Sequence, residues 1–186
     1  MHHLYDWFGL NVALFHLING LHAPWWDRVM LAMTWLGNYE LYPYYLAVVL
    51  LLTQAAPRWL PRRNVAVFAV GYALTAIVVS TLKPLLAFPR PVLALGKTAV
   101  VVLGEPALRE SFPSGHATFV ALLAASLSAR SSRPWRWSLW LFAALVCISR
   151  IAVGAHFPAD VVGGALIGMG AAGLAMLLVR ALTARN

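Results

Sequence analysis

The sequence predicts an all-α integral membrane protein, organised as a bundle of six transmembrane helices with an N-terminal interfacial helix. Of its 186 residues, 61% are hydrophobic and only 11% are charged, and the mean hydropathy is +0.75. A soluble domain carries roughly 25% charged residues, so a soluble core fits this composition poorly. The apolar residues also fall into separate runs, and the charged residues collect in the short stretches between those runs.

The first apolar segment, about residues 4–21, is interrupted by Asn11, His16, Asn19 and Gly20. Such a segment suits a helix that lies in the membrane interface better than one that spans, so residues 1–23 are expected to form an interfacial helix. A spanning helix needs about 20 mostly apolar residues. Candidate spans follow at about residues 24–36, 41–56, 64–82, 116–130, 136–154 and 158–180. The first of these is short, and the whole chain, 1–186, is expected to form a single domain.

The net charge of +8 comes from residues in the short loops between spans, which argues against a basic face that binds nucleic acid. One set of loops, together with the tail, holds Arg28, Arg58, Arg62, Arg63, Arg130, Arg133, Arg136, Arg180 and Arg185. Because cytoplasmic loops are enriched in Lys and Arg, this set is expected inside, with both termini cytoplasmic. The remaining loops, including the longest at about 83–112, then face the exterior of a bacterial cytoplasmic (inner) membrane.

Cysteine and carboxylate usage predicts no metal site and no disulfide. The single cysteine, Cys147, lies inside an apolar run and has no partner in the chain. The exterior side offers only Glu40, Glu105, Glu110 and Asp160, which do not form an acidic cluster in the sequence. No cofactor is expected. Within the long loop, residues 98–103 form a small apolar patch that fits either a structural plug or a substrate contact.

A short motif before the fourth span has the features of an anion site. Pro113-Ser114-Gly115-His116 precedes a long apolar run. Ser114 is expected to cap the helix, and Gly115 lets the backbone approach a ligand closely. The first free amides of a helix and the positive end of its dipole favour bound anions. His116 then lies in the first turn, beside the same point.

A second pair of ionisable residues is expected at the start of the last span. His156 precedes Asp160 by four residues, with Pro158 between them, and proline favours the first position of a helix. Asp160 therefore falls in the first turn and can accept a hydrogen bond from one imidazole nitrogen of His156. That bond would fix the tautomer and leave the other nitrogen free as a base or nucleophile.

Three cations accompany these residues on the same side of the predicted bundle. Lys83 and Arg90 flank the bend after the third span, and Arg150 closes the fifth. Ionisable groups in membrane segments are costly and are usually functional. Fixed cations suit the oxygens of a phosphoryl group, and guanidinium forks bind phosphate in a bidentate manner.

The three segments together resemble the signature of the type-2 phosphatidic acid phosphatase (PAP2) superfamily. The matching parts are Lys83-x6-Arg90-Pro, Pro-Ser114-Gly115-His116 and Ser-Arg150-x5-His156-x3-Asp160. They match in order and in internal spacing, and they lie within a motif core at residues 83–160. Each part alone is a weak signal, whereas the combination is highly specific.

The resemblance implies a role for each matching residue. His156 would be the nucleophile that forms a phosphohistidine, oriented by Asp160, and His116 would be the general acid. The phosphoryl oxygens would be held by Lys83, Arg90, Ser114, Gly115 and Arg150. The family needs no metal. Opposite protonation states in two histidines of one pocket predict a bell-shaped dependence of rate on pH.

The function expected from the resemblance is that of a metal-independent lipid phosphate phosphatase at the outer face of the membrane. The small size of the chain favours undecaprenyl diphosphate as substrate, converted to undecaprenyl phosphate. Phosphatidylglycerol phosphate and a lipid A phosphate are the alternatives. A lipid or anion transporter would instead need inverted repeats and charges near the midplane, which the sequence lacks, and a vanadate-dependent haloperoxidase would be soluble. The sequence does not indicate an oligomeric state.

The last span is rich in glycine. Gly164 and Gly168 have the small-xxx-small spacing that permits close contact between helices. This spacing favours packing within the bundle over dimerisation.

Overall fold

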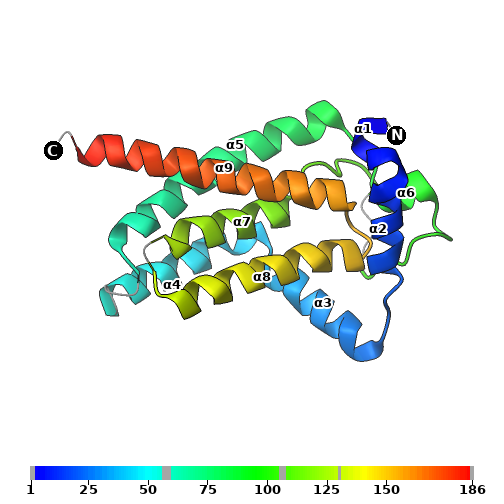
Figure 1. The fold of residues 1–186 in the computed structure, drawn as a ribbon, viewed down its shortest axis with the longest axis horizontal. Helices are drawn as coiled ribbons and strands as arrows, with labels where there is room; N and C mark the ends of the chain where they lie inside the picture. The colour runs from blue at the N-terminus through cyan, green and yellow to red at the C-terminus, as the bar shows by residue number, and fades with distance from the viewer. Residues whose placement is uncertain (1–2, 56–59, 105–107, 130, 185–186) are drawn as a thin grey trace.

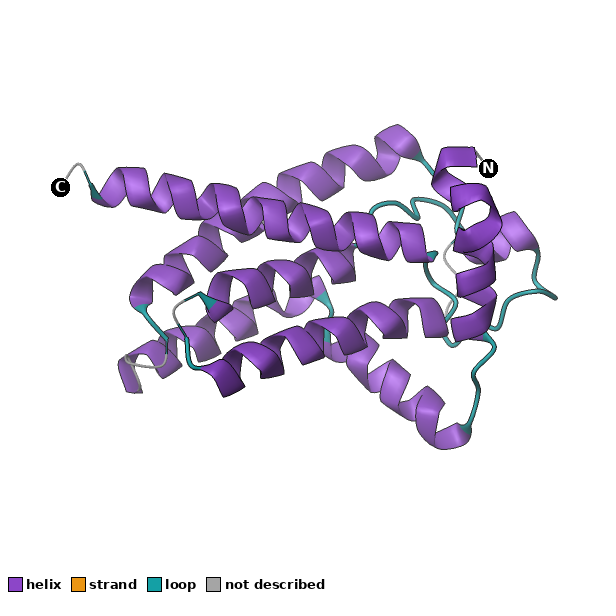
Figure 2. Ribbon diagram, viewed as in Figure 1, coloured by secondary structure: helices purple, strands orange, loops and turns teal. Residues whose placement is uncertain are grey.

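The computed structural model describes residues 3–55, 60–104, 108–129 and 131–184, and it contains helices and loops with no strand in these ranges (Figure 2). The N-terminal helices are α1 (His3–Asp6), the 3-10 helix η1 (Trp7–Gly9) and α2 (Leu10–Asn19). They are followed by α3 (Pro24–Leu36), η2 (Tyr39–Leu41), α4 (Tyr42–Ala55), α5 (Arg62–Leu86), α6 (Pro91–Leu95), α7 (Gly115–Ser128), α8 (Arg133–Ala152) and α9 (Pro158–Thr183).

Helix α7 is the centre of the bundle. It packs against α5, α8 and α9 (Figure 1), and nearly all of its residues are buried. A helix that is apolar all round is expected in the interior, because it has no face that favours water. Phe119, Leu122 and Leu127 are at most 2% exposed and form the middle of the main core.

Three segments are long and apolar enough to cross a membrane: Arg62–Leu95, which contains α5 and α6, together with α8 and α9. Helix α5 is longer than the expected span at 64–82, since it runs past Lys83 and through Pro84 before it ends at Leu86. The bounds predicted for the remaining spans lie within a few residues of the observed helix ends, but α7, with 14 residues, is shorter than the three segments above. The chain is therefore an all-helical integral membrane protein.

Helices α3 and α4 differ from their prediction as two separate spans. Helix α3 has 13 residues, so at 1.5 Å per residue it extends about 20 Å, less than the roughly 30 Å of a hydrocarbon core. It runs beside the last turns of α8, where Thr34 and Ser149 share a hydrogen bond of 2.9 Å between their hydroxyl oxygens. Helix α4 then continues toward the other end of the bundle (Figure 1). The two short helices together make one passage along the bundle.

The N-terminal segment lies across the end of the bundle where α8 ends and α9 begins, hereafter the site end (Figure 1). The buried face of α2 carries Asn11, Phe15 and Asn19, whereas its outer face exposes Leu10 and Leu17 by 54% and 65%. Helix α2 thus turns two asparagines and Phe15 toward the bundle and leaves Leu10 and Leu17 exposed.

The positions of the two ends of the chain correct one prediction. Both termini were expected on the same side, but α1 lies at the site end and α9 carries the chain to the opposite end (Figure 1). The reason is the single passage made by α3 and α4 in place of two spans. Arg62, Arg133 and Arg180, at the start of α5, the start of α8 and the last turn of α9, lie at the end opposite the site.

Candidate active site

Asp160 is the most completely bonded residue at the site end. It lies in the first turn of α9, after Pro158, and its side chain is fully buried. The backbone N–H of Phe157 donates to its Oδ2 over 2.8 Å, and the Ser111 hydroxyl donates to the same atom over 2.5 Å. Oδ1 accepts from the Tyr5 hydroxyl over 2.5 Å. A buried carboxylate needs such donors because it has lost its water.

His156 lies just before α9 and is 2% exposed. Its backbone N–H donates to the Arg150 carbonyl over 3.1 Å, which fixes the loop between α8 and α9. Its Nδ1 lies 3.5 Å from Asp160 Oδ2 and makes no hydrogen bond with the described residues. The expected His-x3-Asp pairing is therefore present as a close approach, while the hydrogen bond itself is not formed.

The surroundings of His156 favour its neutral form. Burial lowers the pKa of His156 to about 4, because it removes the water that would stabilise an imidazolium. The Asp160 carboxylate acts in the opposite direction, and the charges of Arg90 and Arg150 act in the same direction as burial. Near neutral pH the ring is therefore uncharged, which is the form that a nucleophile needs.

Ser114, Gly115 and His116 form the start of α7, as the sequence predicts. Ser114 is the N-cap, and its hydroxyl oxygen accepts from the Ala117 N–H over 3.5 Å. The Ser114 N–H donates to the Asp160 carbonyl over 3.1 Å, so the first turns of α7 and α9 are joined directly. The ring of Tyr39 packs edge-on against His116, with 6.0 Å between the ring centroids.

The three predicted cations lie at the same end of the bundle. Lys83 is in the last turn of α5, and its Nζ donates to the Glu110 carbonyl over 3.2 Å. Arg90 immediately precedes α6 and donates from Nε to the Arg109 carbonyl over 3.1 Å and from Nη1 to the Ala155 carbonyl over 3.3 Å. Loop carbonyls therefore hold both side chains in place.

Arg150 differs from the other two cations, because its guanidinium is buried and incompletely bonded. The residue lies in the last turn of α8, is 9% exposed, and its buried Nε has no hydrogen-bond partner among the described residues. Its charge acts on Lys83 and His116 as well as on His156. An unsatisfied buried donor is costly, so this one is suited to an incoming anion.

Two residues at the site, Ser111 and Tyr5, were not predicted. Ser111 lies just before the Pro-Ser-Gly-His motif, and a hydroxyl two residues before that proline was a usable signal. Tyr39 belongs to a tyrosine-rich stretch whose sequence predicts an outer aromatic belt, with some of its members lining lipid access to the site. Tyr5 has no local signal at all, since it is 155 residues from its partner Asp160.

The apolar patch at 98–103 contributes to the packing beneath α2. Val100 is 7% exposed and packs in one cluster with Phe15 and Phe157. Asn19 bonds both polar atoms of Val101, donating to its carbonyl over 2.8 Å and accepting from its N–H over 3.0 Å. Of the two interpretations of this patch, the structure agrees with the structural plug.

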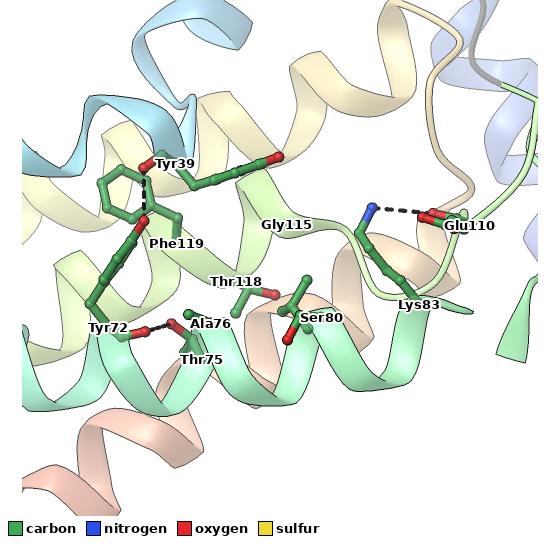
Figure 3. Close-up of a pocket in the computed structure, with 11 residues that line it drawn as sticks. Tyr39, Tyr72, Thr75, Ala76, Ser80, Lys83, Glu110, Gly115, Thr118 and Phe119 are labelled. Carbon is green, nitrogen blue, oxygen red and sulfur yellow. Dashed lines mark hydrogen bonds between the residues drawn. The ribbon is translucent and has the colours of Figure 1, made fainter. Parts of the chain in front are cut away.

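An apolar cavity of about 370 Å³ adjoins the predicted phosphate-binding residues. It is lined by Lys83 and Gly115 at one end and by Tyr72, Thr75 and Phe119 further along α5 and α7 (Figure 3). Tyr39 closes one side, and the Tyr72 hydroxyl donates to its carbonyl over 3.4 Å. The cavity thus joins a cationic end to an apolar length, a shape that suits a lipid phosphate.

Two imidazoles and three cations at one end of a membrane bundle define an integral membrane phosphatase. In the described part of the chain, no group of three or more His, Cys, Asp or Glu side chains could hold a metal ion. The family model described as the PAP2 superfamily matches residues 64–184. The chain belongs to this superfamily, and it is a lipid phosphatase.

Relatives and a solved structure agree with this assignment. Undecaprenyl-diphosphatase BcrC of Bacillus subtilis is 31% identical over 85% of this chain and 78% of its own length. Lipid A 4'-phosphatase of Bacteroides thetaiotaomicron is 29% identical over 95% of this chain and 80% of its own length. The crystal structure of Aquifex aeolicus LpxE superimposes with a TM-score of 0.80 at 29% identity, covering 90% of this chain and 94% of that one.

Proposed function

We propose that this enzyme hydrolyses undecaprenyl diphosphate to undecaprenyl phosphate and inorganic phosphate, without a metal, through a phosphohistidine. The observation that carries the proposal is the neutral, buried His156 near Arg150, whose buried Nε has no hydrogen-bond partner among the described residues. The similarity to BcrC supports the choice of lipid. The apolar cavity next to Lys83 and Gly115 has room for the first part of a prenyl chain.

The reaction proceeds in two balanced steps. His156 attacks the terminal phosphorus, the N–P bond forms, and the bond from phosphorus to the bridging oxygen breaks while His116 gives that oxygen a proton. A water molecule then attacks the phosphorus of the phosphohistidine, a new P–O bond forms as the N–P bond to His156 breaks, neutral His116 takes the water's proton, and inorganic phosphate leaves. Asp160 orients His156 and stabilises the cationic ring of the intermediate.

The remaining predicted residues stabilise charge on the phosphoryl group. Lys83, Arg90 and Arg150 bind its oxygens, assisted by the Ser114 hydroxyl and the Gly115 N–H at the start of α7. Two observations support these roles: loop carbonyls hold Lys83 and Arg90 in place, and the buried Nε of Arg150 meets no hydrogen-bond partner in the part of the chain that the structure describes. Because these cations are already in position, their side chains need to move little when negative charge develops on the phosphoryl oxygens in the transition state.

The membrane arrangement follows from charge and from the faces of α2. We infer that the whole chain, 1–186, forms one domain in a bacterial cytoplasmic membrane, with the site end facing outward and the C-terminus cytoplasmic. The arginines at the opposite end support this orientation. The exposed Leu10 and Leu17 support an interfacial position for α1, η1 and α2 on the outer side.

A lipid A phosphate is the second candidate substrate, favoured by the similarity to lipid A 4'-phosphatase. The two substrates differ in bulk, because lipid A carries several acyl chains whereas undecaprenol is a single chain. A panel assay separates them. Purified protein is given undecaprenyl diphosphate, lipid A and phosphatidylglycerol phosphate, each with a chelator, and released phosphate is measured.

We expect the highest kcat/KM with undecaprenyl diphosphate and no loss of rate with the chelator. A higher kcat/KM with another lipid overturns the choice of substrate, and release that depends on added magnesium overturns the mechanism. With a terminally labelled substrate, quenching should trap an acid-labile phosphoryl group on the enzyme. The His156→Gln variant should carry none, whereas Lys97→Ala, which changes an exposed residue away from the motifs, should match the wild type.

A further inference from the structure

The N-terminal segment reaches into the active site through one side chain. The Tyr5 hydroxyl donates to Oδ1 of Asp160, the residue expected to orient His156. The other described donors to this carboxylate, Ser111 and Phe157, both bind Oδ2. Tyr5 therefore holds one oxygen of a fully buried carboxylate from a different part of the chain.

The position of Tyr5 is fixed on several sides. Its ring lies edge-on to Phe88, with 4.7 Å between the centroids, and to Phe157 at 6.3 Å. Buried Asn11 donates to the Tyr5 carbonyl over 3.2 Å and accepts from the Ala159 N–H over 2.9 Å. One amide side chain thus joins the N-terminal segment to the first turn of α9, directly beside Asp160.

The direction of the bond between Tyr5 and Asp160 is also fixed. Burial, with the nearby charge of Asp160, raises the pKa of Tyr5 above its ordinary value, so the phenol keeps its proton at any working pH. The hydroxyl is then always a donor and the carboxylate oxygen always an acceptor. Such a bond to a charged group is stronger than a bond between neutral groups.

We propose that Tyr5 is a positioning residue of the phosphatase, which holds Asp160 so that Oδ2 faces Nδ1 of His156. The inference rests on the proposed function, because it assigns Tyr5 to the same reaction. Nδ1 is only 3.5 Å from Oδ2, so a small movement forms their hydrogen bond when the ring becomes cationic. Without Tyr5, the carboxylate loses its only described donor on Oδ1 and is held less precisely, although Ser111 and Phe157 keep its Oδ2 beside His156.

The Tyr5 hydroxyl also affects when His156 takes up a proton. Its dipole offsets part of the negative potential of Asp160, so its removal stabilises an imidazolium at His156. The charged or titratable groups that act on His156 from the surrounding elements are Arg90, His116, Arg150 and Asp160. The Tyr5→Phe substitution leaves all of these groups in the protein. A shift of the acid limb, which is the decline of the rate on the acid side of the pH profile, is therefore due to the lost hydroxyl.

The test compares Tyr5→Phe with Tyr45→Phe. Both substitutions remove one hydroxyl and keep the ring; the Tyr45 hydroxyl donates to the Leu36 carbonyl, away from the carboxylate. For Tyr5→Phe we expect kcat to fall about tenfold and the acid limb of the pH profile to move up by about one pH unit, the sizes expected for one hydrogen bond to a charged group. KM and the acid limb of Tyr45→Phe should match the wild type.

Several outcomes overturn the proposal. It is wrong if Tyr5→Phe keeps the wild-type kcat, or if kcat falls in parallel with thermal stability while the acid limb stays in place. If Tyr5→Phe is not recovered folded, the Asn11→Ala variant tests the proposal instead. It removes the side chain that joins the N-terminal segment to α9, and it should show the same upward shift of the acid limb. A wild-type enzyme that releases no phosphate from any lipid phosphate contradicts the proposed function instead.

Discussion

Gly164 lies so close to Ser114 that a Cβ on the glycine would be 2.5 Å from the serine carbonyl oxygen. One turn further along α9, a Cβ on Gly168 would overlap the Thr118 carbonyl oxygen. The small-xxx-small spacing is therefore used for packing within the bundle, which confirms that interpretation of the sequence. Because Ser114 opens α7 and Asp160 opens α9, this contact aligns two motifs of the site.

A methyl group at position 164 should disturb that alignment. Since the nearest atom is backbone, Gly164→Ala forces α7 and α9 apart, and overpacking of this kind costs about 1–3 kcal/mol. We expect a lower thermal midpoint in detergent and a lower rate of phosphate release. Gly170→Ala is the control, because a Cβ there meets nothing within 4 Å. Equal thermal midpoints for the two variants would contradict this account of the contact.

The pH dependence should reflect the burial of His156. Its pKa is lowered from 6.5 to about 4, so the nucleophile stays neutral well below pH 6.5. We expect kcat/KM to decline on the acid side with an apparent pKa clearly below 6.5, as the acid limb of a bell-shaped profile. Rates measured between pH 3.5 and 9 test this. An acid limb centred at 6.5 or above would show that His156 is not the buried group that titrates.

The same shift affects stability. Between pH 6.5 and 4 the unfolded chain binds a proton at His156 that the folded protein does not, so the free energy of unfolding falls as the pH is lowered through this window. Below pH 4 both states are protonated and this contribution becomes constant. A His156→Gln variant should lose less stability than the wild type between pH 6.5 and 4. If both proteins lost the same free energy of unfolding over this pH range, the effect would come from groups other than His156.

Asn19 should be important for stability although it lies outside the motifs. It makes three bonds, to both polar atoms of Val101 and to the Ala152 carbonyl over 2.9 Å. Asn19→Ala leaves these buried backbone groups without their partner, at a cost of about 1–3 kcal/mol for each unsatisfied group. We expect a large drop in the thermal midpoint, whereas Asn38→Ala, which removes exposed bonds only, should change it little.

The parts that sequence predicted well depend on local chemistry. A helix N-cap at Ser114, a proline at the first position of α9 and the apolar spans predicted at 136–154 and 158–180 are all decided by neighbouring residues. All eight predicted site residues consequently lie at one end of the bundle, although their catalytic roles stay predictions. The helix ends were also close, except that α5 continues through Pro84.

The parts that sequence missed depend on contacts between distant segments. The apolar runs of α3 and α4 look like two spans, and only the packing of α3 against α8 and of α4 against α5 shows that they follow one another along the bundle. Asn11 and Asn19 looked like interruptions of an apolar segment, yet they are the groups that attach α2 to the loops of the site. The same polar residues can mark either a weak span or an inward face, and sequence does not distinguish these cases.

Arg150 should be the cation that is least replaceable. Lys83 and Arg90 are partly bonded to loop carbonyls, whereas the buried Nε of Arg150 has no described partner and can donate to a phosphoryl oxygen together with a terminal nitrogen. Arg150→Lys keeps the charge but loses the planar fork. We expect kcat/KM to fall about 100-fold or more, since bonds to charged groups contribute roughly 1.5–3 kcal/mol each.

Orthophosphate, as the product, should inhibit the variant more weakly than the wild type, and Lys97→Ala should leave both quantities unchanged. If Arg150→Lys kept the wild-type kcat/KM and the wild-type inhibition constant for orthophosphate, a point charge would be sufficient and the bidentate role of the guanidinium would be excluded.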